Sequence, residues 1–138
     1  MSRIALIEDG VRSLFHEHDF SGFAPTRIEI RDHHLMVYLR LGHRAYARGQ
    51  GGVMLQLGSI EVFGDNQGKG LKNEVFDFLE RFAAERREIA GVYIESVNNK
   101  DLIPGLRRRG YEIREGDRPL DNEIGLDWYK LTPGVSAT

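Results

Sequence analysis

Residues 65–72, Asp65-Asn66-Gln67-Gly68-Lys69-Gly70-Leu71-Lys72, join a run typical of a β-strand, 53–62, to an amphipathic run typical of a helix, 71–86. A glycine-bearing turn at the start of a helix leaves several backbone N–H groups without intrahelical acceptors. Together with the positive end of the helix dipole, these groups form a site for a phosphate or pyrophosphate. Lys69 and Lys72 can add positive charge at its mouth. We interpret this stretch as an anion-binding loop and the rest of the chain as its scaffold.

Length and composition limit what the chain can be. With 138 residues it is long enough for one core and too short for two, so we expect a single domain over residues 1–138. A net charge of −2 argues against a nucleic acid partner. The absence of cysteine excludes disulfides and thiolate chemistry. The start of the chain lacks a signal pattern and no run has the length of a membrane span, so we expect a cytoplasmic monomer or homodimer without a membrane partner.

The N-terminal part predicts a helix followed by a β-hairpin. Apolar residues recur at helical spacing over 10–19, whereas residues 3–7 fit either a short strand or the first turn of that helix. Apolar and charged residues alternate over 27–31, and apolar residues recur at every second position over 35–41, which predicts an antiparallel pair. The segment 42–52 is rich in glycine and polar residues, and we expect a loop there.

The strand ahead of the anion-binding loop changes its apolar phase. Its apolar residues occupy odd positions up to Leu57 and even positions from Ile60 onward. A phase change at Gly58-Ser59 is what a β-bulge produces, and a bulge can open a gap in a sheet. A strand buried on both faces gives the same pattern without a bulge. The sequence leaves these two interpretations open.

The rest of the chain continues with helices and strands. We expect a helix over 71–86, a strand over 92–97, a short helix over 102–109, and strands over 111–115 and 124–131. A strand, a helix and a strand over this length predict a parallel pair with a right-handed crossover. The fold class is therefore α/β or α+β with a mixed sheet.

From about Val53 to Leu131, and more loosely ahead of it, the chain resembles the GNAT superfamily of N-acetyltransferases. Residues 67–72, Gln-Gly-Lys-Gly-Leu-Lys, are similar to the family's Gln/Arg-x-x-Gly-x-Gly/Ala coenzyme A loop. Val62 stands five residues ahead of that loop, where such proteins end their central strand. The resemblance implies a mixed, mostly antiparallel sheet with a central splayed parallel strand pair, flanked by helices.

Two further segments carry the resemblance. Asn99, eleven residues before Gly110-Tyr111, is similar to the family's Asn…Gly-Phe/Tyr segment, and residues 126–131, LDWYKL, resemble its last strand. Asn99 can hydrogen-bond the pantetheine of the coenzyme or cap the helix that follows it.

The resemblance implies an N-acetyltransferase that transfers an acetyl or acyl group from acetyl-CoA to a primary amine by direct attack in a ternary complex, without a metal. The backbone of residues 60–62 would pair with the pantetheine arm, and the amides of residues 68–72 would hold the pyrophosphate. The implied cofactor-binding residues are Ile60, Val62, Gln67, Gly68, Lys69, Gly70, Leu71, Lys72 and Asn99. The amine could belong to a small molecule, a lysine or a protein N-terminus, and its pocket is expected between the N-terminal helix and segment 42–52.

The chain departs from the family pattern at two positions. Lys72 replaces the final Gly/Ala of the loop, where it either crowds the phosphates or contacts them. Leu106 stands where the family often has a general-acid tyrosine, and a leucine cannot protonate a thiolate. The second departure favours an alternative function, a non-catalytic acyl-CoA-binding or protein-interaction module.

Two carboxylates are candidates for the general base, Glu61 and Glu95, because they lie on the two strands expected to part. Either could take the amine proton directly or through water. Each could instead lie on a solvated strand face or pair with a nearby arginine. Tyr93 and Tyr111 are fallback acids, although such tyrosines more often serve packing.

Overall fold

The computed structural model describes residues 2–68, 70–116 and 124–133. In chain order its elements are α1 (Ala5–Glu17), β1 (Thr26–Arg31), β2 (Leu35–Ala47), β3 (Gln50–Val62), the 3₁₀ turn η1 (Gly64–Asn66), α2 (Leu71–Ala84), β4 (Gly91–Val97), the 3₁₀ turn η2 (Lys100–Leu102), α3 (Ile103–Arg108), β5 (Glu112–Ile113) and β6 (Leu126–Leu131). The strands form one sheet in the order β1-β2-β3-β4-β6-β5, with β3 and β4 parallel and the other neighbouring pairs antiparallel. The predicted fold class is thereby confirmed.

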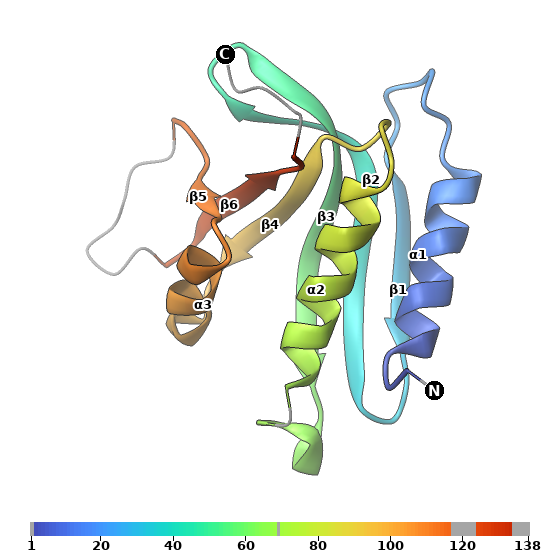
Figure 1. Cartoon of the computed structure of the whole chain (residues 1–138), viewed down its shortest axis with the longest axis vertical. Helices are drawn as coiled ribbons and strands as arrows, with labels where there is room; N and C mark the ends of the chain where they lie inside the picture. Colours follow the sequence, from blue (N-terminus) through green and yellow to red (C-terminus); the bar gives the residue numbers. More distant parts are fainter. Residues whose placement is uncertain (1, 69, 117–123, 134–138) are drawn as a thin grey trace.

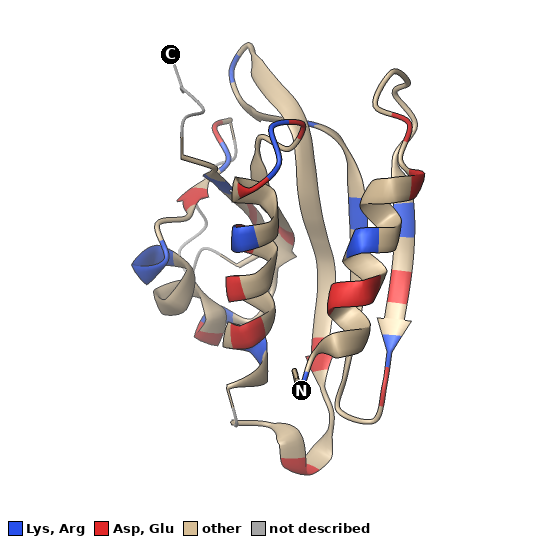
Figure 2. Cartoon of the chain, turned by 45° about the vertical axis from the view of Figure 1, so that its right-hand side comes forward, with Lys and Arg blue, Asp and Glu red and all other residues tan. Residues whose placement is uncertain are grey.

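Helices α1 and α2 pack side by side on one face of the sheet (Figure 1). Their apolar stripes are buried, and the rings of Phe15 and Phe82 meet edge to face with centroids 5.8 Å apart. Figure 2 shows acidic and basic residues interspersed on the outer surfaces of both helices, as expected for amphipathic helices on a core. Residues 5–7, which the sequence left open between strand and helix, belong to α1. No helix in the described part of the chain is long and apolar enough to cross a bilayer.

The predicted loop over residues 42–52 is wrong, because β2 continues to Ala47 and β3 begins at Gln50. Glycines occur here because other chain segments approach closely, which is the second common reason for glycine in a strand. A Cβ at Gly42 would lie 3.0 Å from Pro25, and one at Gly52 would lie 2.9 Å from Ala90. The segment is therefore the outer half of a long β-hairpin.

The tip of this hairpin reaches the far edge of the sheet. The backbone N–H of Glu115, just after β5, donates to the carbonyl of Tyr46 at 3.0 Å. In Figure 1 the tip bends toward the side of the sheet that carries β5 and β6. Beneath it, on the face opposite α1 and α2, lies a small second core, made of Tyr46, Met54, Tyr93 and Tyr129. The hairpin thus covers part of the face that the two helices leave uncovered.

Both interpretations of the phase change in β3 apply to different parts of the strand. Residues 54–57 are all buried, as in a strand covered on both faces. Gly58 is a bulge residue, because Tyr38 of β2 pairs with Ser59 whereas Leu39 pairs with Leu57. Parallel pairing with β4 begins at Met54 and ends at Leu57, directly before the bulge. The bulge therefore coincides with the point where the central strands part.

The C-terminal elements follow the prediction with small changes. The short helix expected over 102–109 consists of η2 and α3, and the strand expected over 111–115 is confined to Glu112–Ile113. The loop containing Pro119 lies outside the described residues. These elements place α3 beside the N-terminal end of α2, where Arg109 bonds to the Asn73 carbonyl at 3.1 Å.

Candidate active site

The anion-binding loop leaves β3 through η1 and enters α2 through two glycines in the left-handed conformation. Gly68 has φ 77° and Gly70 has φ 79°. Nothing lies within 4 Å of a Cβ built at Gly68, so its backbone conformation and not crowding requires glycine there. Gly70 is the N-cap of α2 and supplies no side-chain cap, which leaves the first N–H groups of the helix available to an anion.

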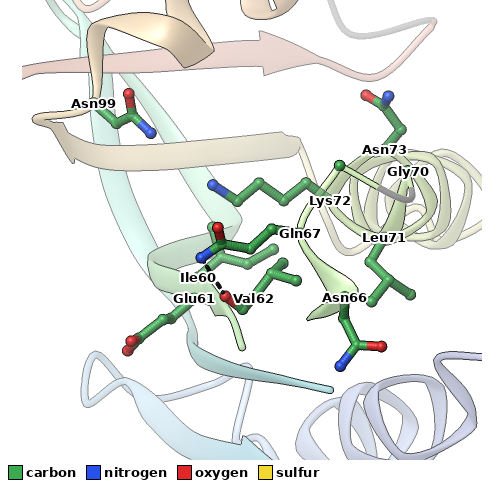
Figure 3. A pocket seen from close by; sticks show the side chains of 11 residues that line it. Ile60, Glu61, Val62, Asn66, Gln67, Gly70, Leu71, Lys72, Asn73 and Asn99 are labelled. Atoms are coloured by element: carbon green, nitrogen blue, oxygen red, sulfur yellow. Dashed lines mark hydrogen bonds between the residues drawn. The ribbon is translucent and has the colours of Figure 1, made fainter. Parts of the chain in front are cut away.

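Gln67 fixes the loop to the end of the central strand. Its side-chain amide Nε2 donates to the carbonyl oxygen of Val62 at 3.1 Å. Figure 3 shows this bond, with the Lys72 side chain extending from the first turn of α2 into the space between Gln67 and Asn99. An ammonium group in this position adds positive charge to the helix N-terminus. Beside it Arg3 forms an ion pair with Glu74, which brings the N-terminal segment to the same loop.

These residues line a pocket of about 570 Å³ (Figure 3). Its lining consists of Ile60, Glu61, Val62, Asn66, Gln67, Gly68, Gly70, Leu71, Lys72, Asn73 and Asn99. The structure thus brings together all of the predicted cofactor-binding residues that it describes, and Lys69 lies outside the described residues. Residues that are 39 positions apart in the sequence, Ile60 and Asn99, meet at this pocket.

A second, smaller pocket of about 210 Å³ lies between the parting strands. Its lining comes from the ends of β3 and β4 and from four residues beside them, Phe76, Asn98, Asn99 and Leu102; the strand residues are Leu57, Gly58, Ser59, Ile60, Ile94, Glu95, Ser96 and Val97. Ile60 and Asn99 line both pockets, so the loop pocket and the strand cleft adjoin one another. The pocket at the N-terminus of α2 thereby leads into the cavity between β3 and β4.

The cleft has a bulge on each of its two walls. On β4, Ile94 pairs with Trp128 of β6 and Val97 pairs with Leu126, so Glu95 and Ser96 lie opposite the single residue Asp127. Ser96 has φ 44°, a left-handed conformation that non-glycine residues rarely adopt. Bulged strands bend and twist more strongly than regular ones. With Gly58 on β3, the two bulges turn the walls away from each other.

The two predicted carboxylates have different surroundings. Glu61 is exposed and lines the loop pocket. Glu95 lines the cleft, forms an ion pair with Arg40, and lies 3.5 Å from Nη1 of Arg44. The Glu95 side chain is 19% exposed. For Glu95, the ion pair with a neighbouring arginine that the sequence left as an alternative is therefore formed.

The tyrosines considered as acids are engaged elsewhere. The Tyr93 hydroxyl donates to Asp127, and burial together with this bond raises the pKa of Tyr93 to about 12. The Tyr111 hydroxyl donates to Glu80 at 3.1 Å, and burial raises the pKa of Tyr111 well above its usual value. Neither residue is part of the lining of the loop pocket or the cleft. Leu106, at the position of the family's tyrosine, is buried.

Asn99 fulfils the capping role that the sequence allowed. Its Oδ1 accepts a hydrogen bond from the backbone N–H of Asp101 at 3.0 Å, at the start of η2. Asn99 also lines both pockets, and its contact with a coenzyme stays a prediction.

The polar group beside the cleft, formed by Arg40, Arg44 and Asp127, was not predicted from the sequence. Asp127 accepts from the Ser96 backbone N–H at 2.7 Å and from Nη2 of Arg44 at 3.1 Å. An aspartate inside the strand LDWYKL was the available signal, because aspartate is depleted in strands. Across residues 2–68, 70–116 and 124–133, no group of three or more His, Asp or Glu side chains is arranged to hold a metal ion.

No family model and no curated protein matches the sequence. Among solved structures, the chain is similar to the KacTA–DNA complex with a TM-score of 0.52 and 18% identity, covering 90% of this chain and 80% of that chain. It is also similar to Arabidopsis thaliana Naa50 in complex with the bisubstrate analogue CoA-Ac-MVNAL, with a TM-score of 0.45 and 13% identity, covering 70% of this chain and 71% of that chain. The likeness to the first structure, together with the strand order and the parting parallel pair, shows that the chain has the GNAT N-acetyltransferase fold.

Proposed function

We propose that this chain is a single-domain, acyl-CoA-dependent N-acyltransferase that transfers an acetyl or acyl group from acetyl-CoA to a primary amine. The observation that carries the proposal is the junction of the loop pocket with the strand cleft at Ile60 and Asn99. Coenzyme A has a charged diphosphate at one end and a thin thiol-bearing arm at the other. A polar pocket at a helix N-terminus that continues into an apolar slot matches that distribution of charge.

In this proposal the diphosphate binds at the amides of Gly68 and residues 70–72, with Lys72 adding charge. The pantetheine arm lies along the backbone of residues 60–62, which continues beyond the last residue of β3 that pairs with β4. Gln67 holds the loop against the end of β3 and so fixes the position of the diphosphate site relative to the site for the pantetheine arm.

The reaction is a direct transfer. The amine nitrogen forms a bond to the thioester carbonyl carbon, the carbon–sulfur bond breaks, and the coenzyme leaves as a thiolate. A backbone N–H near Val62 is proposed to stabilise the developing oxyanion. The amine must lose a proton, and Glu61 is the preferred acceptor because it is exposed and forms no ion pair with another described residue, whereas Glu95 is paired with Arg40 and Arg44. Glu95 is the second candidate.

The residues considered as general acids are not placed to protonate the thiolate. Leu106 is buried and apolar, and the hydroxyls of Tyr93 and Tyr111 are bonded to carboxylates outside the cleft. A thiolate is a fair leaving group, so we propose that it departs unassisted or takes a proton from water. Segment 42–52 was expected to form part of the acceptor pocket. Because it is a hairpin packed toward β5, we do not place the acceptor pocket there.

A non-catalytic acyl-CoA-binding or protein-interaction module is the second candidate. The observation that favours it is the burial of Leu106, with both fallback tyrosines engaged in other bonds. A cytoplasmic location and a monomeric or homodimeric state remain part of both proposals.

Two measurements on the whole chain separate the candidates. Isothermal titration with acetyl-CoA tests binding, and release of free thiol in the presence of a panel of primary amines tests transfer. Binding with amine-dependent release supports the transferase. Binding without release from any amine supports the module, and absence of binding contradicts both.

A further inference from the structure

We propose that Asp127 is a positioning residue that holds the coenzyme cleft open by fixing the bulge of β4. The inference rests on the proposed function, because the cleft matters for catalysis only if it takes the coenzyme arm. It concerns a residue on β6, which lines neither pocket.

The first observation is the backbone of Ser96. With φ 44°, Ser96 adopts a conformation in which a side chain crowds its own backbone, so this conformation persists only where the surroundings hold it. Oδ1 of Asp127 accepts a hydrogen bond from the Ser96 N–H at 2.7 Å. This is a charge-assisted bond across the bulge, from the one residue of β6 that faces two residues of β4.

The second observation is that the carboxylate itself is held. Its Oδ2 accepts from the Tyr93 hydroxyl and from Nη2 of Arg44, at 3.1 Å in the second case. The Arg44 guanidinium also lies over the Tyr93 ring, 4.6 Å from its centroid. The Asp127 side chain is 14% exposed. A carboxylate with partners on both oxygens cannot easily turn away from Ser96.

The third observation is the place of this bond in the sheet. Parallel pairing between β3 and β4 ends at Leu57 and Ile94, and the bulge begins at the next residue of β4. An extended Ser96 would straighten β4 and let it continue alongside β3 beyond Ile94. The backbones of β3 and β4 beyond Leu57 and Ile94 could then pair with each other, and the slot would close. The Asp127–Ser96 bond opposes this closure.

Ser96→Gly provides the test, because glycine adopts a positive φ without a holding partner. We expect Asp127→Ala to weaken acetyl-CoA binding at least tenfold in isothermal titration. Ser96→Gly added to Asp127→Ala should restore most of that affinity. Tyr93→Phe, which removes one partner of Asp127 but leaves the bond to Ser96, should bind acetyl-CoA within about twofold of the unaltered chain.

A second readout does not depend on the coenzyme. The Ser96 amide should be protected from hydrogen exchange in the unaltered chain and should exchange at least tenfold faster in Asp127→Ala, as followed by NMR. If the unaltered chain does not bind acetyl-CoA but shows this difference, the proposed function fails and the role of Asp127 in the bulge stands. Unchanged exchange in Asp127→Ala, or failure of Ser96→Gly to restore affinity, overturns the inference.

Should Asp127→Ala not fold, the double variant decides. Recovery of a folded, acetyl-CoA-binding protein on adding Ser96→Gly supports the inference, because only relief of the backbone conformation at residue 96 is gained. A double variant that remains unfolded shows that Asp127 acts mainly through Tyr93 and Arg44, and overturns it.

Discussion

Tyr38 packs on Gly58 so closely that a Cβ at Gly58 would lie 2.6 Å from Cδ1 of the tyrosine ring. The contact joins the bulge residue of β3 to the neighbouring strand β2, at the level where the parallel pair ends. Glycine is required at this bulge because a side chain would collide with the Tyr38 ring. The backbone conformation does not require it, since Gly58 is not among the residues with positive φ.

Gly58→Ala should therefore displace either the Tyr38 ring or the strand. We expect a loss of about 1–3 kcal/mol in the free energy of unfolding, as for overpacked sites, with weaker acetyl-CoA binding. Urea unfolding and isothermal titration measure the two effects. Ser59→Ala, at the exposed neighbour, is the control for the unfolding measurement, and Tyr38→Ala in the Gly58→Ala background should recover part of the stability. A stable Gly58→Ala protein with unchanged affinity would contradict the role of this contact.

Lys72→Gln tests whether this departure from the family loop assists or obstructs the phosphates. The ammonium group extends into the loop pocket, so its loss should weaken acetyl-CoA binding about fivefold, or about 1 kcal/mol. The affinity of the variant should also depend less on salt concentration. Arg87→Gln, an exposed charge beyond the other end of α2, is the matched control. Tighter binding by Lys72→Gln would show that the lysine crowds the phosphates.

The two roles of Asn99 can be separated by two substitutions. Asn99→Ala removes the acceptor for the Asp101 N–H and should cost about 1 kcal/mol in unfolding free energy. Asn99→Asp keeps an acceptor, so stability should stay within about 0.5 kcal/mol, while its negative charge in both pockets should weaken acetyl-CoA binding. Thermal unfolding and titration of the two variants give the comparison. Equal affinity of Asn99→Asp and the unaltered chain would exclude coenzyme contact at this position.

Alkaline unfolding should report the buried hydroxyl of Tyr93, whose pKa is raised to about 12 by burial and by its bond to Asp127. An unfolded tyrosine loses its proton near pH 10, whereas the folded one keeps it, so the unfolded state binds fewer protons between these values. Stability should be full below pH 10 and fall between pH 10 and 12, with Tyr93 contributing up to about 1.4 kcal/mol per pH unit. Urea unfolding from pH 9 to 11.5 should show a shallower fall for Tyr93→Phe. An identical slope would contradict the assignment.

Substitution of the two candidate bases should have different effects, one on turnover and the other on stability. Glu61→Gln should lower kcat by about 10²–10³-fold at neutral pH, with acetyl-CoA affinity retained, because only proton removal is lost. Glu95→Gln should lower the unfolding free energy by about 1–3 kcal/mol, because Arg40 and Arg44 lose a charged partner. Thiol-release kinetics and urea unfolding distinguish these outcomes. Turnover that survives both substitutions together would remove each as the base.

Much of the site could be predicted because its signals are local. Gly68 and Gly70 indicate a helix start that needs left-handed backbone, and the apolar phase change allowed a bulge at Gly58-Ser59 as one of two interpretations. The parallel pair follows from a strand, helix and strand in sequence order. These features depend on neighbours along the chain, which the sequence displays directly.

What failed depends on residues that meet from distant parts of the chain. The glycines of 42–52 indicated a loop, but Gly42 and Gly52 are needed because Pro25 and Ala90 approach them. Likewise, nothing within four residues of Asp127 indicates that its carboxylate bonds to Ser96, 31 positions away. Such contacts are set by strand register, which a single sequence does not specify.

The opposed bulges at Gly58 and Ser96 also bear on how the protein could be redesigned. Because backbone register sets the width of the slot, exchanging the apolar side chains along it should alter its depth without sealing it. Phe76 and Leu102 project into the lining from a helix and a 3₁₀ turn, outside the sheet itself. Trimming them offers a route to longer acyl donors while the scaffold stays intact.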